Sequence, residues 1–174
     1  MKKILLLLYY VILRRIHPFT SEDDSLSNKL RYYAVKHILK HCGKDVTVRY
    51  NCYFGIGDRL SAGDRCSLGY NSRLLGNITL GNDCMMGPDV VMMSMSHAYD
   101  RTDIPIKQQG AKEDKPIVIG DDCWIGTRVI IMPGVHLGNH CIVGSGAVVT
   151  KSFPDYSVIG GVPAKLIKTR IQQK

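Results

Sequence analysis

A six-residue repeat occupies most of this chain and limits its fold more than any other feature. Apolar residues recur at every sixth position in two blocks, and thirteen successive positions fit. They are Ile56, Ala62, Leu68, Leu74, Leu80, Met86 and Met92, then Ile119, Ile125, Ile131, Leu137, Val143 and Val149. Glycine follows immediately in nine of the thirteen. A period of six fits neither an amphipathic helix, with a period of about 3.6, nor a simple strand, with a period of about 2.

The repeat predicts a solenoid of short strands joined by corners. Three hexads would close one triangular coil, and the apolar residue of each hexad would point into the prism. A second, smaller inward position follows four residues later: Leu60, Cys66, Ser72, Ile78, Cys84, Val90, Cys123, Val129, Val135, Cys141, Ala147 and Phe153. Within these, Cys66 and Cys84 are eighteen residues apart, as are Cys123 and Cys141, so each pair should stack on adjacent coils. The glycines are expected to supply the backbone freedom that tight corners need.

The repeat is interrupted once. Met92 and Ile119 are 27 residues apart, which is not a multiple of six, so the frame is lost between them. Residues 98–114 are polar and carry no hexad, which predicts a loop projecting from the prism. Long irregular loops in a compact repeat are usually functional.

The chain before the repeat divides into two segments. Residues 1–24 contain an apolar run, 4–13, with basic residues on both sides, and end in a polar linker. The run is too short to span a bilayer. It is either a peripheral membrane anchor or a helix buried against the body or a neighbouring subunit. Residues 25–43 are expected to hold a helix that begins at Ser25 or Ser27, ends near His41 and caps the solenoid. The solenoid is assigned to 44–166, with a C-terminal tail at 167–174.

Charge and cysteine content restrict the partners and the setting. The formal net charge is +8, which suits an anionic partner. The basic residues form no run and have no interleaved aromatic residues, which argues against nucleic acid. Four of the six cysteines occupy the small inward position. We therefore expect reduced structural thiols and a cytoplasmic protein, in solution or at the inner face of the membrane.

Several motifs together carry a family resemblance. They are residues 86–90 (MGPDV), 96–100 (SHAYD), 121–126 (DDCWIG), 133–135 (PGV), 144–151 (GSGAVVTK) and 160–165 (GGVPAK). Over about residues 44–168 the chain resembles the left-handed β-helix (hexapeptide-repeat) acyltransferases, in the branch of maltose, galactoside and polysaccharide O-acetyltransferases. The resemblance implies an all-β, left-handed parallel β-helix and a homotrimer. Neither the handedness nor the trimer follows from the spacing.

The resemblance also implies an activity. It points to an acetyl-CoA-dependent O-acetyltransferase acting on a saccharide hydroxyl, in surface polysaccharide or lipopolysaccharide biosynthesis. His97 matches the catalytic base of the family, and histidine is the side chain best suited to take a hydroxyl proton at neutral pH. Asp100 matches the H-x-x-D pattern of the catalytic motif, while Asp89 and Tyr99 match the acceptor site. The group that orients His97 is left open between Asp100, Asp89 and a backbone carbonyl.

Acetyl-CoA, as co-substrate, is assigned by the same match. The residues implied are Trp124, Thr127, Ser145, Thr150, Lys151, Lys165 and Lys168. Trp124 directly follows the inward Cys123, so its side chain should point outward, where it can contact a ligand or another subunit. Lys165 and Lys168 match basic positions that meet the phosphates of the nucleotide in the family.

Two other function classes are compatible with a β-helix. A metal-dependent β-helix enzyme resembling the γ-type carbonic anhydrases would need three histidines at one zinc ion, and His97, His136 and His140 are the candidates. His136 and His140 fall at different positions of the hexad, so no metal site is expected. A non-catalytic scaffold would need only the inward repeat and leaves the motifs around His97 and Trp124 without a purpose.

Overall fold

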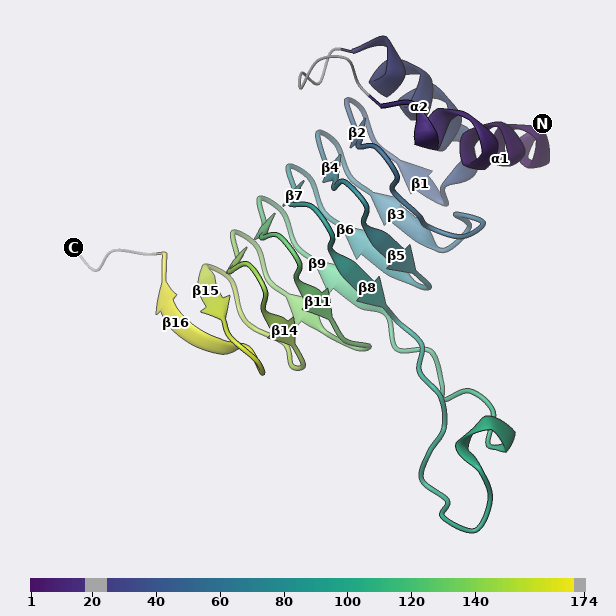
Figure 1. Ribbon diagram of the computed structural model, residues 1–174. Coiled ribbons are helices and arrows are strands. Elements are labelled where there is room, and N and C mark those ends of the chain that lie inside the picture. Colours follow the sequence, from purple (N-terminus) through teal and green to yellow (C-terminus); the bar gives the residue numbers. More distant parts are fainter. Residues whose placement is uncertain (18–24, 171–174) are drawn as a thin grey trace.

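The computed structural model describes residues 1–17 and 25–170, which form a stack of coils with helices at one end (Figure 1). The helices are α1 (Lys2–Val11), η1 (Leu13–Arg15), α2 (Leu26–Ile38) and, in the loop, η2 (Ile106–Gln108). The strands are β1 (His41–Cys42), β2 (Thr47–Val48), β3 (Leu60–Ala62), β4 (Ser67–Leu68), β5 (Arg73–Leu75), β6 (Ile78–Leu80), β7 (Met85–Met86), β8 (Val91–Met93), β9 (Ile117–Ile119), β10 (Trp124–Ile125), β11 (Ile130–Ile131), β12 (His136–Leu137), β13 (Ile142–Val143), β14 (Val148–Val149), β15 (Ser157–Gly160) and β16 (Lys165–Thr169).

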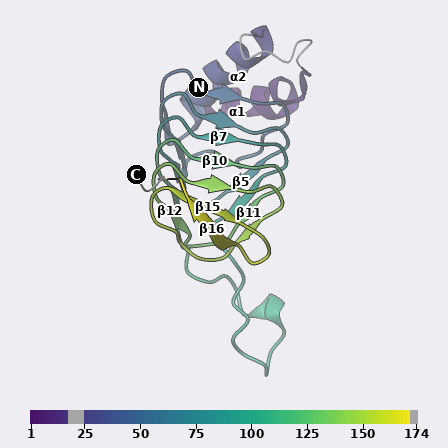
Figure 2. The same ribbon diagram turned by 90° about the vertical axis from the view of Figure 1, so that its left-hand side faces the viewer.

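The strands form three sheets that run along the stack (Figure 2). We call them sheet A (β1-β3-β6-β9-β12), sheet B (β16-β15-β13-β10-β7-β4-β2) and sheet C (β14-β11-β8-β5). Neighbouring strands are parallel except for the antiparallel pair β15 and β16. Trp124 pairs with Ile142, eighteen residues on, and with Met85, 39 residues back. The coil that carries the loop is therefore 39 − 18 = 21 residues longer than the regular one.

The interior of the prism is the hydrophobic core. All twelve positions of the small inward series are buried, and so are the hexad positions from Ala62 onward. Ile56 is the exception: it is 60% exposed, and the interior position of the first coil is filled by Phe54. The assignment of Ile56 to the interior was wrong because the first coil is two residues longer than the period. Thr47 pairs with Ser67, twenty residues away.

The corners explain the glycines differently from our prediction. The left-handed backbone at two of the three corners is adopted by other residues, such as Arg65 between sheets A and B and Asn71 and Asp89 between sheets B and C, with φ of 56°, 54° and 58°. Most of the glycines that follow the hexad residues are needed because the next coil lies against them; Gly144 has more room, and Gly57 does adopt a left-handed φ of 74°. A Cβ on Gly63 would lie 2.6 Å from the carbonyl oxygen of Gly81, a distance that real Cβ atoms essentially never show. Close stacking, rather than backbone freedom, therefore demands glycine there.

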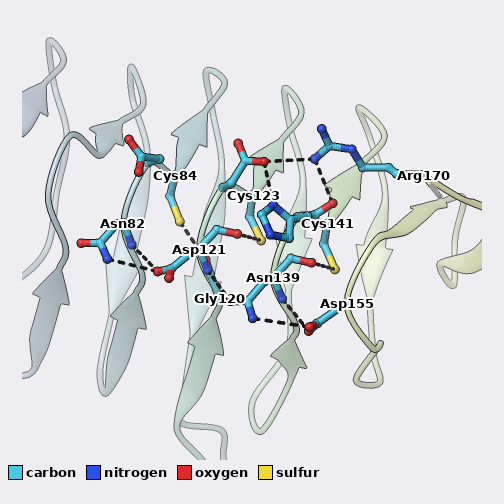
Figure 3. A network of polar contacts seen from close by, with 12 residues as sticks. Asn82, Cys84, Gly120, Asp121, Cys123, Asn139, Cys141, Asp155 and Arg170 are labelled. Carbon is cyan, nitrogen blue, oxygen red and sulfur yellow. Dashed lines mark hydrogen bonds and ion pairs between the residues drawn. The ribbon is translucent and has the colours of Figure 1, made fainter.

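Polar groups at the corner between sheets A and B follow the same stacking (Figure 3). The backbone N–H of Asp121 donates to Asn139 Oδ1 at 2.8 Å, and that of Asn139 donates to Asp155 Oδ1 at 2.8 Å. Beside this ladder the thiols of Cys66, Cys84, Cys123 and Cys141 form a column, and each donates to a carbonyl of the following coil at 2.8–3.2 Å. The predicted stacking of the cysteines is confirmed, and all of these thiols are free.

The N-terminal helix α1 packs on the first coil. Tyr9 is fully buried and donates its hydroxyl to the carbonyl of Cys52 at 2.8 Å, while Tyr10 donates to that of Gly55 at 2.7 Å. One face of the apolar run thus covers the body, as one of the two interpretations proposed. The opposite face, with Ile4 and Leu7, is exposed. In the described part of the chain, no helix has the length and apolarity that crossing a membrane requires.

Helix α2 closes the open end of the solenoid. Its N-cap Ser25 accepts from the N–H of Asn28 at 3.3 Å. Arg31 is fully buried, and its guanidinium donates to the carbonyls of Val48 and Ile16 at 2.6 and 3.0 Å. Those bonds join α2 to the first coil and to the chain after η1.

The ends of the predicted segments differ from those observed. Helix α2 ends at Ile38 instead of near His41, because His41 and Cys42 already pair with β3 as strand β1. At the other end, residues expected to begin the tail at 167 continue strand β16, which lies antiparallel to β15. Residues 18–24 of the predicted linker and 171–174 of the predicted tail lie outside the described residues.

Candidate active site

The predicted loop projects from the stack between β8 and β9, away from the helices (Figure 1). Its two ends run side by side as a short antiparallel ribbon. His97 and Ala111 form an isolated antiparallel bridge, and the N–H of Ala98 donates to the carbonyl of Gly110 at 3.0 Å. The N–H of Lys112 donates to the carbonyl of Ser96 at 2.9 Å. This ribbon fixes the backbone on both sides of His97.

A buried clasp joins the ribbon to the coils. Ser94 is fully buried; its hydroxyl accepts from the N–H of Asn77 at 2.8 Å and donates to the carboxylate of Asp114. Asp114 also forms an ion pair with Arg59. The N–H of Lys115 donates to the carbonyl of Ser94 at 2.9 Å. The entry and exit of the loop are thus tied to each other and to the preceding coil.

His97 lies beside an apolar pocket. The pocket has a volume of about 390 Å³ and is lined by Met93, Met95, Ser96, His97, Ala111, Met132 and Pro133. Its walls come from two adjacent coils, because Met93 ends β8 and Met132 follows β11. The His97 side chain is exposed. An imidazole that is open to solvent beside a pocket can exchange protons with a bound molecule.

The acidic residues proposed for the site have other partners. Asp100 forms an ion pair with Lys112 at 3.1 Å, and the Lys112 ammonium lies 3.7 Å from the centre of the Tyr99 ring. Asp89 lies at the corner before β8, where its carboxylate is 3.9 Å from Arg128. Within residues 1–17 and 25–170, no group is found hydrogen-bonded to the His97 ring. Asp100 and Tyr99 follow His97 closely in the sequence. Within one chain, however, neither Asp100 nor Asp89 contacts the His97 ring to orient it, because their partners are Lys112 and Arg128.

The residues assigned to acetyl-CoA lie on several faces. Trp124 projects from sheet B and is 49% exposed, as its position after Cys123 predicted. Thr127 and Ser145 occupy adjacent coils at the corner between sheets B and C, where the N–H of Gly146 donates to the carbonyl of Thr127 at 2.8 Å.

The remaining four assigned positions lie elsewhere. Thr150 and Lys151 follow β14, one coil beyond Met132 in the wall of the His97 pocket. Lys165 and Lys168 are exposed on β16, at the end of sheet B. One chain therefore presents these residues as separate groups.

The other histidines are not gathered with His97. His136 is on β12, and His140 occupies the next corner, where its Nδ1 is 2.9 Å from Asp122 and its ring stacks on Tyr156. Among the described residues no three His, Cys, Asp or Glu side chains lie close enough to hold a metal ion. Another hollow, of about 860 Å³, lies beside His136 and Phe153 and is lined by none of the residues assigned to catalysis, acceptor or coenzyme.

The sequence missed several residues that shape the site. Ser94 and Asp114 are separated by the whole loop, and nothing in the repeat pairs them. The available signal was the place of Ser94 two residues after the inward Met92, where strand alternation turns it inward and a buried hydroxyl needs partners. The methionines of the pocket could not be recognised, since the repeat does not show which outward residues border the loop.

Comparisons with known proteins place the chain among transferases. The family model for the bacterial transferase hexapeptide (six repeats) matches residues 116–151. A putative acetyltransferase of Dictyostelium discoideum is 36% identical over 88% of this chain and 78% of that protein. The galactoside O-acetyltransferase of Escherichia coli is 28% identical over 77% of this chain. The chain spans 66% of that relative, and 55% and 37% of two further curated acetyltransferases.

Solved structures agree. A hexapeptide-repeat acetyltransferase of Vibrio cholerae, solved with acetyl coenzyme A, has a TM-score of 0.78 and 28% identity over 86% of this chain and 81% of its own. A maltose O-acetyltransferase of Clostridium difficile has a TM-score of 0.77 and 28% identity over 98% of this chain and 90% of its own. The fold is the left-handed parallel β-helix that the resemblance implied. Repeat, fold and relatives together show that the chain belongs to the hexapeptide-repeat acyltransferase family.

Proposed function

We propose that this chain transfers the acetyl group of acetyl-CoA to a hydroxyl of a saccharide. The observation that carries the proposal is the position of His97, exposed beside a pocket and held by a ribbon and a buried clasp. Support comes from the relatives, which include a galactoside and a maltose O-acetyltransferase and a structure solved with acetyl-CoA. The process that the acetylation serves is proposed to be surface polysaccharide or lipopolysaccharide biosynthesis in the cytoplasm.

The residues present fit such a reaction. Acetyl-CoA supplies an acetyl group activated as a thioester. His97 takes the proton of the acceptor hydroxyl while its oxygen bonds to the acetyl carbon, and the carbon–sulfur bond breaks as the proton passes to the departing sulfur. The products are the O-acetyl saccharide and free CoA thiol. Trp124, Thr127, Ser145, Thr150, Lys151, Lys165 and Lys168 offer an exposed aromatic face, hydroxyls and ammonium groups to the coenzyme.

The test compares the wild-type chain with His97→Ala. Isothermal titration with acetyl-CoA should give one site per chain for both proteins. Release of CoA thiol in the presence of galactosides, maltose and other saccharides should be lower in His97→Ala by about 10²–10⁴-fold. His136→Ala, which removes a histidine from another face, is the matched control and should keep full turnover. Equal turnover of His97→Ala and wild type would disprove the role of His97, and a wild-type chain that binds no acetyl-CoA would disprove the function.

A homotrimer would complete the site. One chain presents its coenzyme residues as separate groups and offers the His97 ring no orienting partner within the described residues. Exposed apolar side chains, such as Trp124, Met85 and Ile167, favour burial against further copies. Sedimentation equilibrium should give about three times the 19.4 kDa of one chain. A monomer at micromolar concentration with full activity would contradict this assembly.

Peripheral membrane contact through residues 4–13 is proposed from the outer face of α1. Ile4, Leu7 and Val11 are exposed, with Lys2 and Lys3 next to them. Apolar residues flanked by basic ones suit the surface of an anionic membrane. A Leu7→Ser/Val11→Ser variant keeps Tyr9 and its contacts and should float less with vesicles containing phosphatidylglycerol. Equal flotation of the variant and the wild type would rule out this contact.

The metal-dependent and scaffold functions have less support. His97, His136 and His140 lie on the loop ribbon, on β12 and at a corner, so they do not converge. A scaffold would not need the clasp of Ser94 and Asp114 or the pocket beside His97. We therefore propose neither.

A further inference from the structure

A second, polar pocket lies at the N-terminal end of the stack. It has a volume of about 390 Å³ and is lined by Arg14, Asn51, Tyr53, Asn71, Arg73 and Asp89. Three of these residues, Asn51, Asn71 and Asp89, have left-handed φ and occupy the same corner on three successive coils. Arg14 comes from η1, so the N-terminal segment contributes a wall. None of these residues except Asp89 was predicted to belong to a site.

The structure holds Arg14 in a fixed orientation. Its Nε donates to Asn51 Oδ1 at 2.9 Å, and its own carbonyl accepts from the N–H of Asn51 at 2.9 Å. The guanidinium carbon lies 5.4 Å and 5.5 Å from the centres of the Tyr10 and Tyr53 rings. Cation–π contacts of this kind restrain a guanidinium without neutralising its charge. Within residues 1–17 and 25–170 no other hydrogen bond of this guanidinium is found, so its remaining N–H groups can donate to a ligand.

Arg73 supplies the second positive charge. It begins strand β5, is exposed, and lies opposite Tyr53 in an isolated parallel bridge. No ion pair or hydrogen bond of its guanidinium is found within residues 1–17 and 25–170. Two guanidinium groups without a carboxylate partner in the described chain, lining one pocket, form a site for an anion, because guanidinium groups bind phosphate and carboxylate through paired N–H donors.

The other polar side chains of the pocket can bind the hydroxyl groups of a sugar. Asn51 donates its amide to Asn71 Oδ1 at 3.0 Å, which leaves the amide NH₂ of Asn71 as a donor. Asp89 is only 3.9 Å from Arg128, outside the pocket, so part of its charge is balanced there. Its carboxylate can accept from a sugar hydroxyl. Anion donors and hydroxyl partners in one pocket match a saccharide that carries a negatively charged group.

We propose that this pocket binds the phosphate or carboxylate of an anionic saccharide, which is the acceptor of the transfer. That the bound saccharide is the acceptor rests on the proposed function, whereas the binding of an anionic saccharide to this pocket does not. Strand β8 begins two residues after Asp89 and leads to His97. His97 lies eight positions after Asp89, at most about 29 Å of extended chain, so an acceptor longer than one sugar can reach both.

The test uses the full chain and defined probes. Isothermal titration at fixed salt compares glucose 1-phosphate, glucuronate, inorganic phosphate and glucose, with the wild type and Arg73→Gln. We expect a charged sugar to bind more tightly than glucose and inorganic phosphate, and its affinity to fall about tenfold to hundredfold in Arg73→Gln. Preference for glucose 1-phosphate over glucuronate, or the reverse, identifies phosphate or carboxylate as the anion.

Arg65→Gln is the matched control. Arg65 is an exposed corner arginine paired with Asp83, on another corner of the prism, so this change removes the same charge away from the pocket and should leave the sugar affinity unchanged. Equal losses in both variants would overturn the proposal, because net charge alone would then explain binding. It would equally fall if charged sugars bound no better than glucose or inorganic phosphate.

Titration with acetyl-CoA distinguishes a failure of this proposal from a failure of the proposed transferase function. Its affinity should be the same in Arg73→Gln and in the wild type. A parallel loss of acetyl-CoA affinity would assign the arginines to the phosphates of the coenzyme and overturn the acceptor site. If the wild type bound charged sugars but no acetyl-CoA, the proposed transferase function would fail while the anion pocket remained.

Discussion

The interior of the coils and the loop between β8 and β9 are built under different constraints. Inside the prism each side chain repeats the environment of the one a coil earlier, so thiols stack on thiols and aliphatic residues on aliphatic residues. In the loop, each contact is made once, by Ser94, Asp114 and Lys112 with partners of their own. The repeated region determines stability over its whole length, while the unique contacts place the candidate catalytic histidine. Changes in the two regions should therefore affect different measurements.

The largest effect is expected for Gly69→Ala. A Cβ at this position would collide with the carbonyl oxygen of Gly87 in the next coil, and neither backbone can move without opening the stack. Overpacking against backbone should cost about 3 kcal/mol or more of the free energy of unfolding. Urea unfolding followed by circular dichroism measures it. Gly144→Ala is the control, because its nearest neighbour, the Ile159 carbonyl oxygen, lies 3.3 Å away. If both variants were equally stable, close stacking would not be the reason for the glycines.

The coils could be predicted from the sequence only in part. The period identifies inward residues such as Leu68 and Cys84, because in a stack of coils the positions that face the interior recur at a fixed spacing. It placed Ile56 inside wrongly, since two extra residues in the first coil leave no trace in the spacing. The glycines were visible, but their role depends on the distance between coils, which a sequence does not contain.

The site was predictable only in part, for the same reason. His97 was proposed from its motif, and the outward position of Trp124 was predicted from its place beside an inward residue. The partner of Asp100 is Lys112 because the two ends of the loop form a ribbon, and no periodicity connects them. Contacts made once have no pattern to reveal them. The pocket of Arg14 and Arg73 joins an N-terminal segment to a corner of the solenoid and was invisible for that reason.

A smaller and different effect is expected for Asp114→Ala, which opens the clasp and leaves the coils intact. The Ser94 hydroxyl keeps the N–H of Asn77 as a partner, so thermal stability should change little. The ribbon that carries His97 loses its anchor, and kcat should fall about tenfold with KM for acetyl-CoA unchanged, since small displacements of a catalytic group are costly. Steady-state CoA release measures both constants.

Two further variants separate positioning from general damage. Asp114→Asn can still accept from Ser94 but loses the charge that faces Arg59, and should recover part of kcat. Asp103→Ala removes a carboxylate that pairs with Arg101 within the exposed loop and should not alter kcat. A rise in KM for acetyl-CoA with unchanged kcat in Asp114→Ala would refute the positioning role.

The smallest effect is expected for Asp122→Asn, at an exposed contact between coils that is also made only once. Hydrogen bonds from His140 and Arg170 lower the pKa of the Asp122 carboxyl in the folded chain, and through Arg170 they hold the end of β16 (Figure 3). Because the pKa is lower in the folded state, the contribution is present above the unfolded pKa of about 3.9 and is lost as pH falls through the folded value. Solvent exposure limits it to less than about 1 kcal/mol. The melting temperatures of wild type and variant should differ slightly at pH 6 and converge in acid; a difference that persists below the folded pKa would mean that packing of β16, and not the charge of Asp122, is responsible.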